Sequence, residues 1–288
     1  MDINEISALI NLLDDPDSNV YNAIRNKLTQ LGAPVIPHLE KAWETSLDEL
    51  FQTRIENIIQ VIHHTDIKNK LQKWNDNSEH DLLEGAAIIS QFQYSDVKIE
   101  DIYEKIESIK KDIWLEINNN LTALEKIKIV NHIFFDVHNF SRSKAFYNSI
   151  QGFFINHLLN TKKGSPIALA IVYASICQQL DIPVYGVALP KNFILCFKDK
   201  MQVAFDEDFE EGVLFYINPF NKGVVFGKKE IELFIKQQKL ENKKAYFQPS
   251  SNKDTLIHLL KEIIVFYENN GDKTKVENYQ SLLKILYF

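Results

Sequence analysis

The chain has 288 residues, of which 45% are hydrophobic, and a formal net charge of −7. This length and composition can bury a large core, so we expect two or three packed units. The acidic balance and the lack of a basic patch disfavour nucleic acid as a partner.

The cysteine content and the first residues indicate a compartment. The two cysteines, Cys177 and Cys196, are too few for a disulfide framework and are typical of a reducing environment. The opening segment MDINEISALINLLDD carries acidic residues where a signal peptide carries basic ones, and no apolar run reaches transmembrane length. We therefore expect a cytoplasmic protein with no membrane association.

Residues 1–75 are expected to form helices. Apolar residues recur three and four positions apart on both sides of the DPD turn at residues 15–17. Gly32 ends one predicted helix, and Pro34 precedes the next, which is expected to turn Trp43 inward.

The segment LLDDPDSNVYNAIRNKLTQLGAPVIPHL resembles a HEAT-type repeat, with an acidic turn, a helix, a glycine and a proline that opens the next helix. Two helix pairs are too few for a free-standing solenoid, so repeats of this kind would dock on their neighbours. An ordinary helical bundle fits the same pattern.

Residues 76–245 are expected to contain the core of the protein. Two apolar stripes with helical period predict two helices after a polar stretch. The first stripe consists of Ile102, Ile106, Ile109, Ile113 and Ile117, and Trp114 lies beside it. The second stripe consists of Leu124, Ile127, Val130, Ile133 and Phe134.

The segment after residue 162 predicts one buried helix and three strands. Ser165 is a natural N-cap, and Pro166 is favoured at the first helical position. The helix over residues 167–180 is apolar nearly all round, which is typical of a helix covered on several sides. Strands are predicted over 184–189, from Asn192 onward, and over 214–218, and together they form a small antiparallel sheet.

Three parts of this segment together resemble the transglutaminase-like superfamily, whose members have a papain-like fold. They are GSPIALAIVYASICQQLDIP at the helix, PKNFIL at the strand turn and INPF after the third strand. The closest likeness is to the branch with a Gly-x-Pro-Ile helix start and a C-terminal tetratricopeptide-like helix pair. The resemblance implies a catalytic Cys, His and Asp at three positions that here are Pro166, Asn192 and Asn218; we call these the triad positions.

The residues at the triad positions cannot perform the family's chemistry. Proline has no nucleophile, and an amide such as that of Asn192 does not titrate near neutral pH. An asparagine can orient a catalytic histidine, but Asn218 has no histidine to orient. Because such groups act as a unit, their joint loss predicts a non-catalytic domain, a pseudoenzyme.

The sequence predicts no metal or cofactor site. His63 and His64 are adjacent and diverge on a helix, and His132 and His138 are six residues apart, a spacing that suits no common ligand pair. The acidic run at residues 206–211 lacks the glycine and glutamate of an EF-hand loop.

Residues 246–288 predict a helix, a glycine turn and a second helix. The pattern FYENNGDKTKVENYQSLLKIL resembles one tetratricopeptide-like pair, and a simple C-terminal helical hairpin fits it as well.

The predicted fold class is therefore α+β and predominantly α. It has a helical N-terminal bundle (1–75), a papain-like, transglutaminase-like core with a small antiparallel sheet (76–245) and a C-terminal helix pair (246–288). We expect an interaction or scaffold module that binds a protein or peptide. Its candidate groove consists of Ser165, Tyr185, Asn192 and Asn218.

Two other functions stay open at this point. One is an amide hydrolase or acyltransferase that uses residues outside the triad positions. The other is a scaffold whose partner binds the N-terminal helices.

Overall fold

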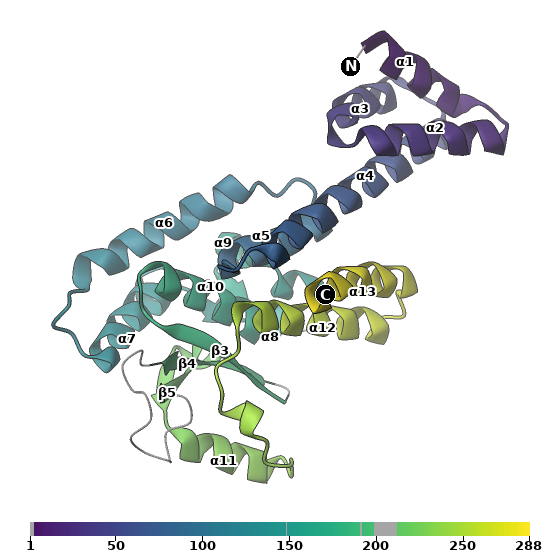
Figure 1. The fold of residues 1–288 in the computed structure, drawn as a ribbon. Helices are drawn as coiled ribbons and strands as arrows, with labels where there is room; N and C mark the ends of the chain where they lie inside the picture. Colours follow the sequence, from purple (N-terminus) through teal and green to yellow (C-terminus); the bar gives the residue numbers. More distant parts are fainter. Residues whose placement is uncertain (1–2, 148, 191, 199–211) are drawn as a thin grey trace. The chain divides into compact units, whose positions relative to one another are not determined.

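The computed structural model describes residues 3–147, 149–190, 192–198 and 212–288 (Figure 1). The contacts divide the chain into two units, Met1–Lys70 and Leu71–Phe288, which are described separately below. The boundaries predicted from the sequence, after residues 75 and 245, stay predictions.

The first unit contains three helices and the beginning of a fourth. They are α1 (Ile3–Asn11), α2 (Ser18–Leu31), α3 (Ile36–Thr45) and α4 (Glu49–Asp76), with 3₁₀ turns at Leu12–Asp14 and Ala33–Val35. The predicted breaks are confirmed: Asp17 caps α2 by accepting from the backbone N–H of Asn19, and Gly32 ends it with a φ of 73°.

The core of this unit is aliphatic. Its buried members are Ile6, Leu9, Ile10, Leu13, Leu28, Val35, Leu39, Ile55, Ile58 and Ile62. Arg54 binds the turn after α1: its Nη1 donates to the carbonyls of Leu13 and Asp15 at 2.5 and 2.9 Å. Such bonds satisfy carbonyls that would otherwise be left over where a helix ends.

Trp43 corrects the prediction that it points inward. Its side chain is 38% exposed, and the indole N–H donates to Glu56 Oε1 at 2.8 Å. The indole therefore lies at the edge of the core, where its polar N–H finds a partner.

The second unit is mainly helical. After the end of α4 it contains α5 (Leu82–Gln93), α6 (Ile99–Glu116), α7 (Ala123–Asn131), α8 (Lys144–Tyr147), α9 (Ile155–Thr161), α10 (Pro166–Gln179), α11 (Lys228–Gln237), α12 (Asn252–Asn269) and α13 (Lys273–Tyr287). Shorter turns are a π-helical segment (His132–Val137) and the 3₁₀ turns η4 (Ile150–Phe153), η6 (Pro219–Asn221) and η7 (Lys244–Tyr246).

The strands form one antiparallel sheet and one short parallel pair. The sheet has the order β3 (Val184–Leu189), β4 (Asn192–Lys198), β5 (Val213–Asn218) and β6 (Val224–Phe226), and the parallel pair is β1 (Ser141–Arg142) with β2 (Lys163–Gly164). The predicted fold class, α+β and predominantly α with a small antiparallel sheet, is confirmed.

Helix α10 is the centre of this unit. Every residue from Pro166 to Cys177 is buried, as the apolar sequence predicts. It contacts β3, β4, α5 and α9, while α11 lies on the other side of the sheet (Figure 1). Residues of α11 join the sheet in a second cluster, which we call the α11 cluster; its buried members are Val187, Leu189, Ile194, Cys196, Val213, Tyr216, Ile231, Ile235 and Phe247.

A buried hydrogen-bond network ties α10 to the turn after β5. The hydroxyl of Tyr173, which is fully buried, donates to Asn131 Oδ1 at 2.8 Å. Asn131 Nδ2 donates in turn to the carbonyl of Gly223 at 2.8 Å. Gly223 has a φ of +68°, and a Cβ added there would lie 1.9 Å from Asn131 Oδ1. The turn therefore needs glycine both for its backbone conformation and for its contact with Asn131.

Gly223→Ala is expected to lower the free energy of unfolding by about 2 to 4 kcal/mol, because displacing Asn131 leaves the Tyr173 hydroxyl buried without its acceptor. Gly271→Ala is the matched control, since Gly271 has a φ of +76° but nothing within 4 Å of an added Cβ. The control should lose about 1 kcal/mol from backbone strain alone. Urea unfolding measures both, and equal losses would contradict a stabilising role for the network.

Candidate functional site

Ser165 and Pro166 lie where α10 begins. Ser165 Oγ accepts from the backbone N–H of Ala168 at 3.3 Å, and its own N–H donates to the Gly152 carbonyl at 3.1 Å. Pro166 is the first residue of the helix and is buried. Positive partial charge gathers at a helix N-terminus, which in a cysteine at this position would stabilise a thiolate. Here the position carries a saturated ring with no group that ionises.

Asn192 begins β4 and pairs with Leu189 across the hairpin. Its side-chain oxygen accepts from the backbone N–H of Phe193 at 3.0 Å. The side chain is partly exposed. Its acceptor is thus engaged by its own backbone, as is common for asparagine near turns.

Asn218 ends β5 and caps the turn that follows. Its Oδ1 accepts from the backbone N–H groups of Phe220 at 3.1 Å and Asn221 at 3.2 Å. The carbonyl of Asn218 also accepts from the N–H of Gly223 at 2.9 Å. The residue therefore shapes the η6 turn, a role that aspartate or asparagine fills by the same side-chain geometry.

The strand register brings two of the triad positions together. Leu195 pairs with Ile217, so Asn218 lies opposite Ile194, two residues from Asn192, at the same end of neighbouring strands. Because side chains alternate, both asparagines share the sheet face of Ile194, which belongs to the α11 cluster. Pro166 starts the helix that lies across the sheet from α11 (Figure 1).

The register separates Tyr185 from the two asparagines. Tyr185 pairs with Cys196, four residues along β3 from the Leu189–Asn192 pair. At about 3.3 Å per residue, that is about 13 Å along the strand. Tyr185 packs against the α11 cluster, whereas Ser165 caps α10. The four residues of the candidate groove therefore fall into three places.

The two cysteines are buried and weakly acidic. Burial raises the pKa of the Cys177 thiol in α10 far above its ordinary value. Burial likewise raises the pKa of Cys196 in β4 to about 12, against a smaller lowering by a hydrogen bond with the Tyr185 backbone and by Lys198. The thiolate is the reactive form of cysteine, so neither side chain is nucleophilic at neutral pH.

A concave pocket of about 280 Å³ lies beside the η6 turn. We call it the η6 pocket. Its apolar walls are Phe135, Pro219 and Phe220, and its polar lining includes Ser141, Arg142 and Lys222. Sequence reasoning missed it because β1 and η6 lie about 80 residues apart, and the chain offers no motif that pairs them.

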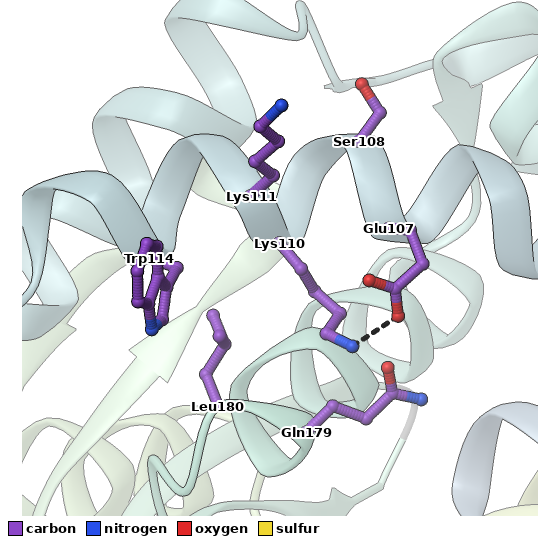
Figure 2. Close-up of a pocket in the computed structure, with 7 residues that line it drawn as sticks. All are labelled: Glu107, Ser108, Lys110, Lys111, Trp114, Gln179 and Leu180. Carbon is purple, nitrogen blue, oxygen red and sulfur yellow. Dashed lines mark hydrogen bonds and ion pairs between the residues drawn. The ribbon is translucent and has the colours of Figure 1, made fainter.

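A second, wider pocket of about 540 Å³ lies between α6 and the end of α10. Figure 2 shows Trp114 beside Leu180, with Lys110 reaching toward Glu107. The Lys110 Nζ lies 2.5 Å from Glu107 Oε1, so that ammonium group is already paired. Trp114 is 66% exposed. The pocket offers an apolar contact surface and no nucleophile paired with a base.

Histidine–carboxylate pairs occur at residues other than the triad positions, and the ring of His258 packs against Phe193, which follows Asn192. His138 Nε2 lies 2.8 Å from Asp112 Oδ2, and His258 Nε2 lies 3.1 Å from Glu262 Oε1. In the described ranges, no group of three or more His, Cys, Asp or Glu residues is placed to bind a metal ion. The acidic run at 206–211, considered above for calcium, lies outside the described residues.

Among the residues with described structure, none forms a helix that combines the length and the apolar character needed to cross a membrane.

The raised thiol pKa values predict both reactivity and pH dependence. At neutral pH, a thiol-specific disulfide reagent should modify neither cysteine until the chain is unfolded.

The stabilisation from burying the Cys196 thiol is complete below its ordinary pKa of 9.0 and is lost as pH rises toward about 12. The difference in unfolding free energy between the natural chain and Cys196→Ala should therefore shrink over that range. Fast labelling of the folded protein at pH 7 would contradict the burial of these thiols.

Comparison with known proteins gives several relatives at low identity. The chain is 28% identical over 138 residues to a UPF0162 protein of Buchnera aphidicola subsp. Schizaphis graminum, covering 48% of this chain and 46% of that protein. It is 25% identical over 193 residues to F-box only protein 21 of Homo sapiens (59% and 30%). It is 23% identical over 155 residues to protein SirB1 of Salmonella typhimurium (54% of each). The chain thus spans about half or less of the length of these relatives.

A family model matches more than half of the chain. No solved structure matches the chain. The model described as transglutaminase-like superfamily matches residues 100–261, which include α10, the whole four-stranded sheet and all three triad positions. The chain belongs to the transglutaminase-like superfamily.

Proposed function

We propose that this chain is a non-catalytic member of the superfamily that binds a protein or peptide partner. The observation that carries the proposal is the start of α10, where catalytic members of the wider superfamily have a nucleophilic cysteine and this chain has a buried proline, Pro166. A proline ring can neither attack a carbonyl nor be activated by a base.

The other two triad positions support the same proposal. The side-chain oxygens of Asn192 and Asn218 accept hydrogen bonds from neighbouring backbone N–H groups. Neither side chain can take up a proton near neutral pH, so neither can be the general base. The buried, weakly acidic Cys177 and Cys196 offer no substitute thiolate.

The printed names of the relatives reported above are UPF0162 protein, F-box only protein 21 and SirB1, and they speak neither for nor against catalysis. We further propose that the protein is cytoplasmic. In this proposal, residues 1–75 form HEAT-like helices, and residues 246–288 form a tetratricopeptide-like pair that packs on the core.

The proposal is tested by putting the family residues back. Pro166→Cys alone is compared with the triple variant Pro166→Cys, Asn192→His, Asn218→Asp, and the rate of alkylation by iodoacetamide is measured against pH. The register places the two asparagines on the α11 side of the sheet, away from α10. The new thiol should therefore have the same pH profile in both variants, with a midpoint set by the helix N-terminus and by burial alone.

A thiol pKa lowered by about two units or more in the triple variant alone would show an intact triad geometry. Hydrolysis of an amide by that variant would do the same. Either result would mean that the site was lost only by side-chain replacement. A matched control, Ser165→Cys, separates the general effect of the helix N-terminus from that of the other two residues.

The second candidate is an amide hydrolase or acyltransferase with a shifted site. One observation favours it: Ser141 lines the η6 pocket, and His138, three residues earlier, forms a 2.8 Å contact with Asp112. Serine, histidine and aspartate are the parts of a common hydrolase triad. This candidate predicts amide turnover that Ser141→Ala abolishes, whereas a binding protein shows none to lose.

A further inference from the structure

The η6 pocket is lined by positive charge, although the chain as a whole is acidic. The chain has a net charge of −7, yet the two charged side chains that line this pocket, Arg142 and Lys222, are both cations. Among the described residues, no carboxylate pairs with Arg142, whose guanidinium lies 5.8 Å from the centre of the Phe220 ring. An arginine held against an aromatic ring keeps its N–H fork available for a planar anion.

Lys222 adds a second positive charge. Its Nζ lies 3.4 Å from Asp136 Oδ1, and the two side chains are 71% and 54% exposed. An ion pair this exposed is weak, so Lys222 can turn toward a bound anion at little cost. Asp136 itself does not line the pocket.

Backbone contacts fix the positions from which both side chains extend. Arg142 belongs to β1, which pairs with β2 immediately before the start of α10, and the Ser141 N–H donates to the Lys162 carbonyl at 2.9 Å. Lys222 follows the η6 turn that Asn218 caps, and has a φ of +50°. Such a preorganised site loses less freedom on binding.

Of the other residues that line the pocket, Phe135, Pro219 and Phe220 are apolar, and Ser141 and Asn221 are polar. Phe135 is 5% exposed, and Pro219 and Phe220 line the same pocket. A volume of about 280 Å³ is at the small end of ligand sites and suits one amino acid residue rather than a helix or strand. A ligand that fits must therefore carry a carboxylate and an apolar side chain close together.

We propose that the η6 pocket binds the C-terminal residue of a peptide, with its carboxylate on Arg142 and Lys222 and its apolar side chain between Phe135 and Phe220. A C-terminal residue carries both groups on one Cα, whereas an internal aspartate or glutamate carries the carboxylate without an apolar side chain. The proposal rests on the peptide-binding role proposed above and names the part of the peptide that is recognised.

The test measures the fluorescence anisotropy of a labelled peptide, Gly-Ser-Gly-Ser-Phe with a free carboxylate, against the full chain. The same peptide with a C-terminal amide should bind about tenfold weaker or worse, because a charge-assisted hydrogen bond is lost. A peptide that ends in glycine should also bind about tenfold weaker, since the apolar walls lose their contact. Binding of the free acid should weaken as salt is added.

Variants locate the site. Arg142→Gln should weaken binding of the free acid about tenfold, and Arg142→Lys less, because the charge stays and the fork is lost. Arg25→Gln, the same change in the unit of residues 1–70, is the matched control and should leave binding unchanged. Circular dichroism of each variant checks that it is folded.

The inference would be overturned by no binding of the free acid up to about 1 mM, by equal binding of acid and amide, or by binding that Arg142→Gln does not change. Equal binding of an amidated peptide with an internal aspartate would also overturn it, since the C-terminus would not be what is recognised. These binding results do not depend on whether position 166 carries a nucleophile. The iodoacetamide comparison therefore tests the proposed loss of catalysis separately.

Discussion

The burial of α10 is the constraint on which the larger unit depends. A helix that is apolar on every side cannot face water, so it must be covered all round. The sheet covers one side, and α5 and α9 are among the helices that contact it. The hydroxyl of Tyr173, a fully buried polar group of this helix, is satisfied by Asn131, which also donates to the carbonyl of Gly223. Packing and hydrogen bonding thus position the turn after Asn218 relative to the helix.

The residues that this fold needs at the start of α10 and after β5 are not the residues that catalysis would need there. The start of α10 needs a good N-cap and a residue compatible with a first helical turn, and Ser165 and Pro166 meet both needs. The β5 turn needs an acceptor for two N–H groups, and Asn218 provides it. None of these needs calls for an ionisable side chain. A transglutaminase-like frame can therefore be kept with residues that do not ionise at positions 166 and 218.

Local patterns predicted most of the frame. The cap, the proline and the apolar run of α10 lie next to one another in sequence, and the third strand was predicted within one residue of β5. The exposure of single side chains was harder to predict. Periodicity shows which face of a helix is apolar but not how far the neighbouring elements extend, so Trp43 was wrongly predicted to point inward. The three-residue strand β6 and the two-residue strands β1 and β2 depend on pairing with distant segments, and no local signal marks them.

The candidate site also depends on pairing between segments that are distant in the sequence. The triad positions were predicted by counting along the chain from the motifs of the resemblance. The side of the sheet on which Asn192 and Asn218 lie follows only from the pairing of β4 with β5. The η6 pocket joins residues 142 and 222 through the β1–β2 pair and the contacts of η6, so its cations looked like isolated surface charges in the sequence.

The central claim is that the chain retains the fold without the catalysis. The most direct measurement follows peptide amide hydrolysis and amine incorporation by the purified natural chain, with Asn192→Ala alongside. The account predicts no turnover above that of the heat-denatured protein in either case. Turnover by the natural chain that Asn192→Ala abolishes would contradict it.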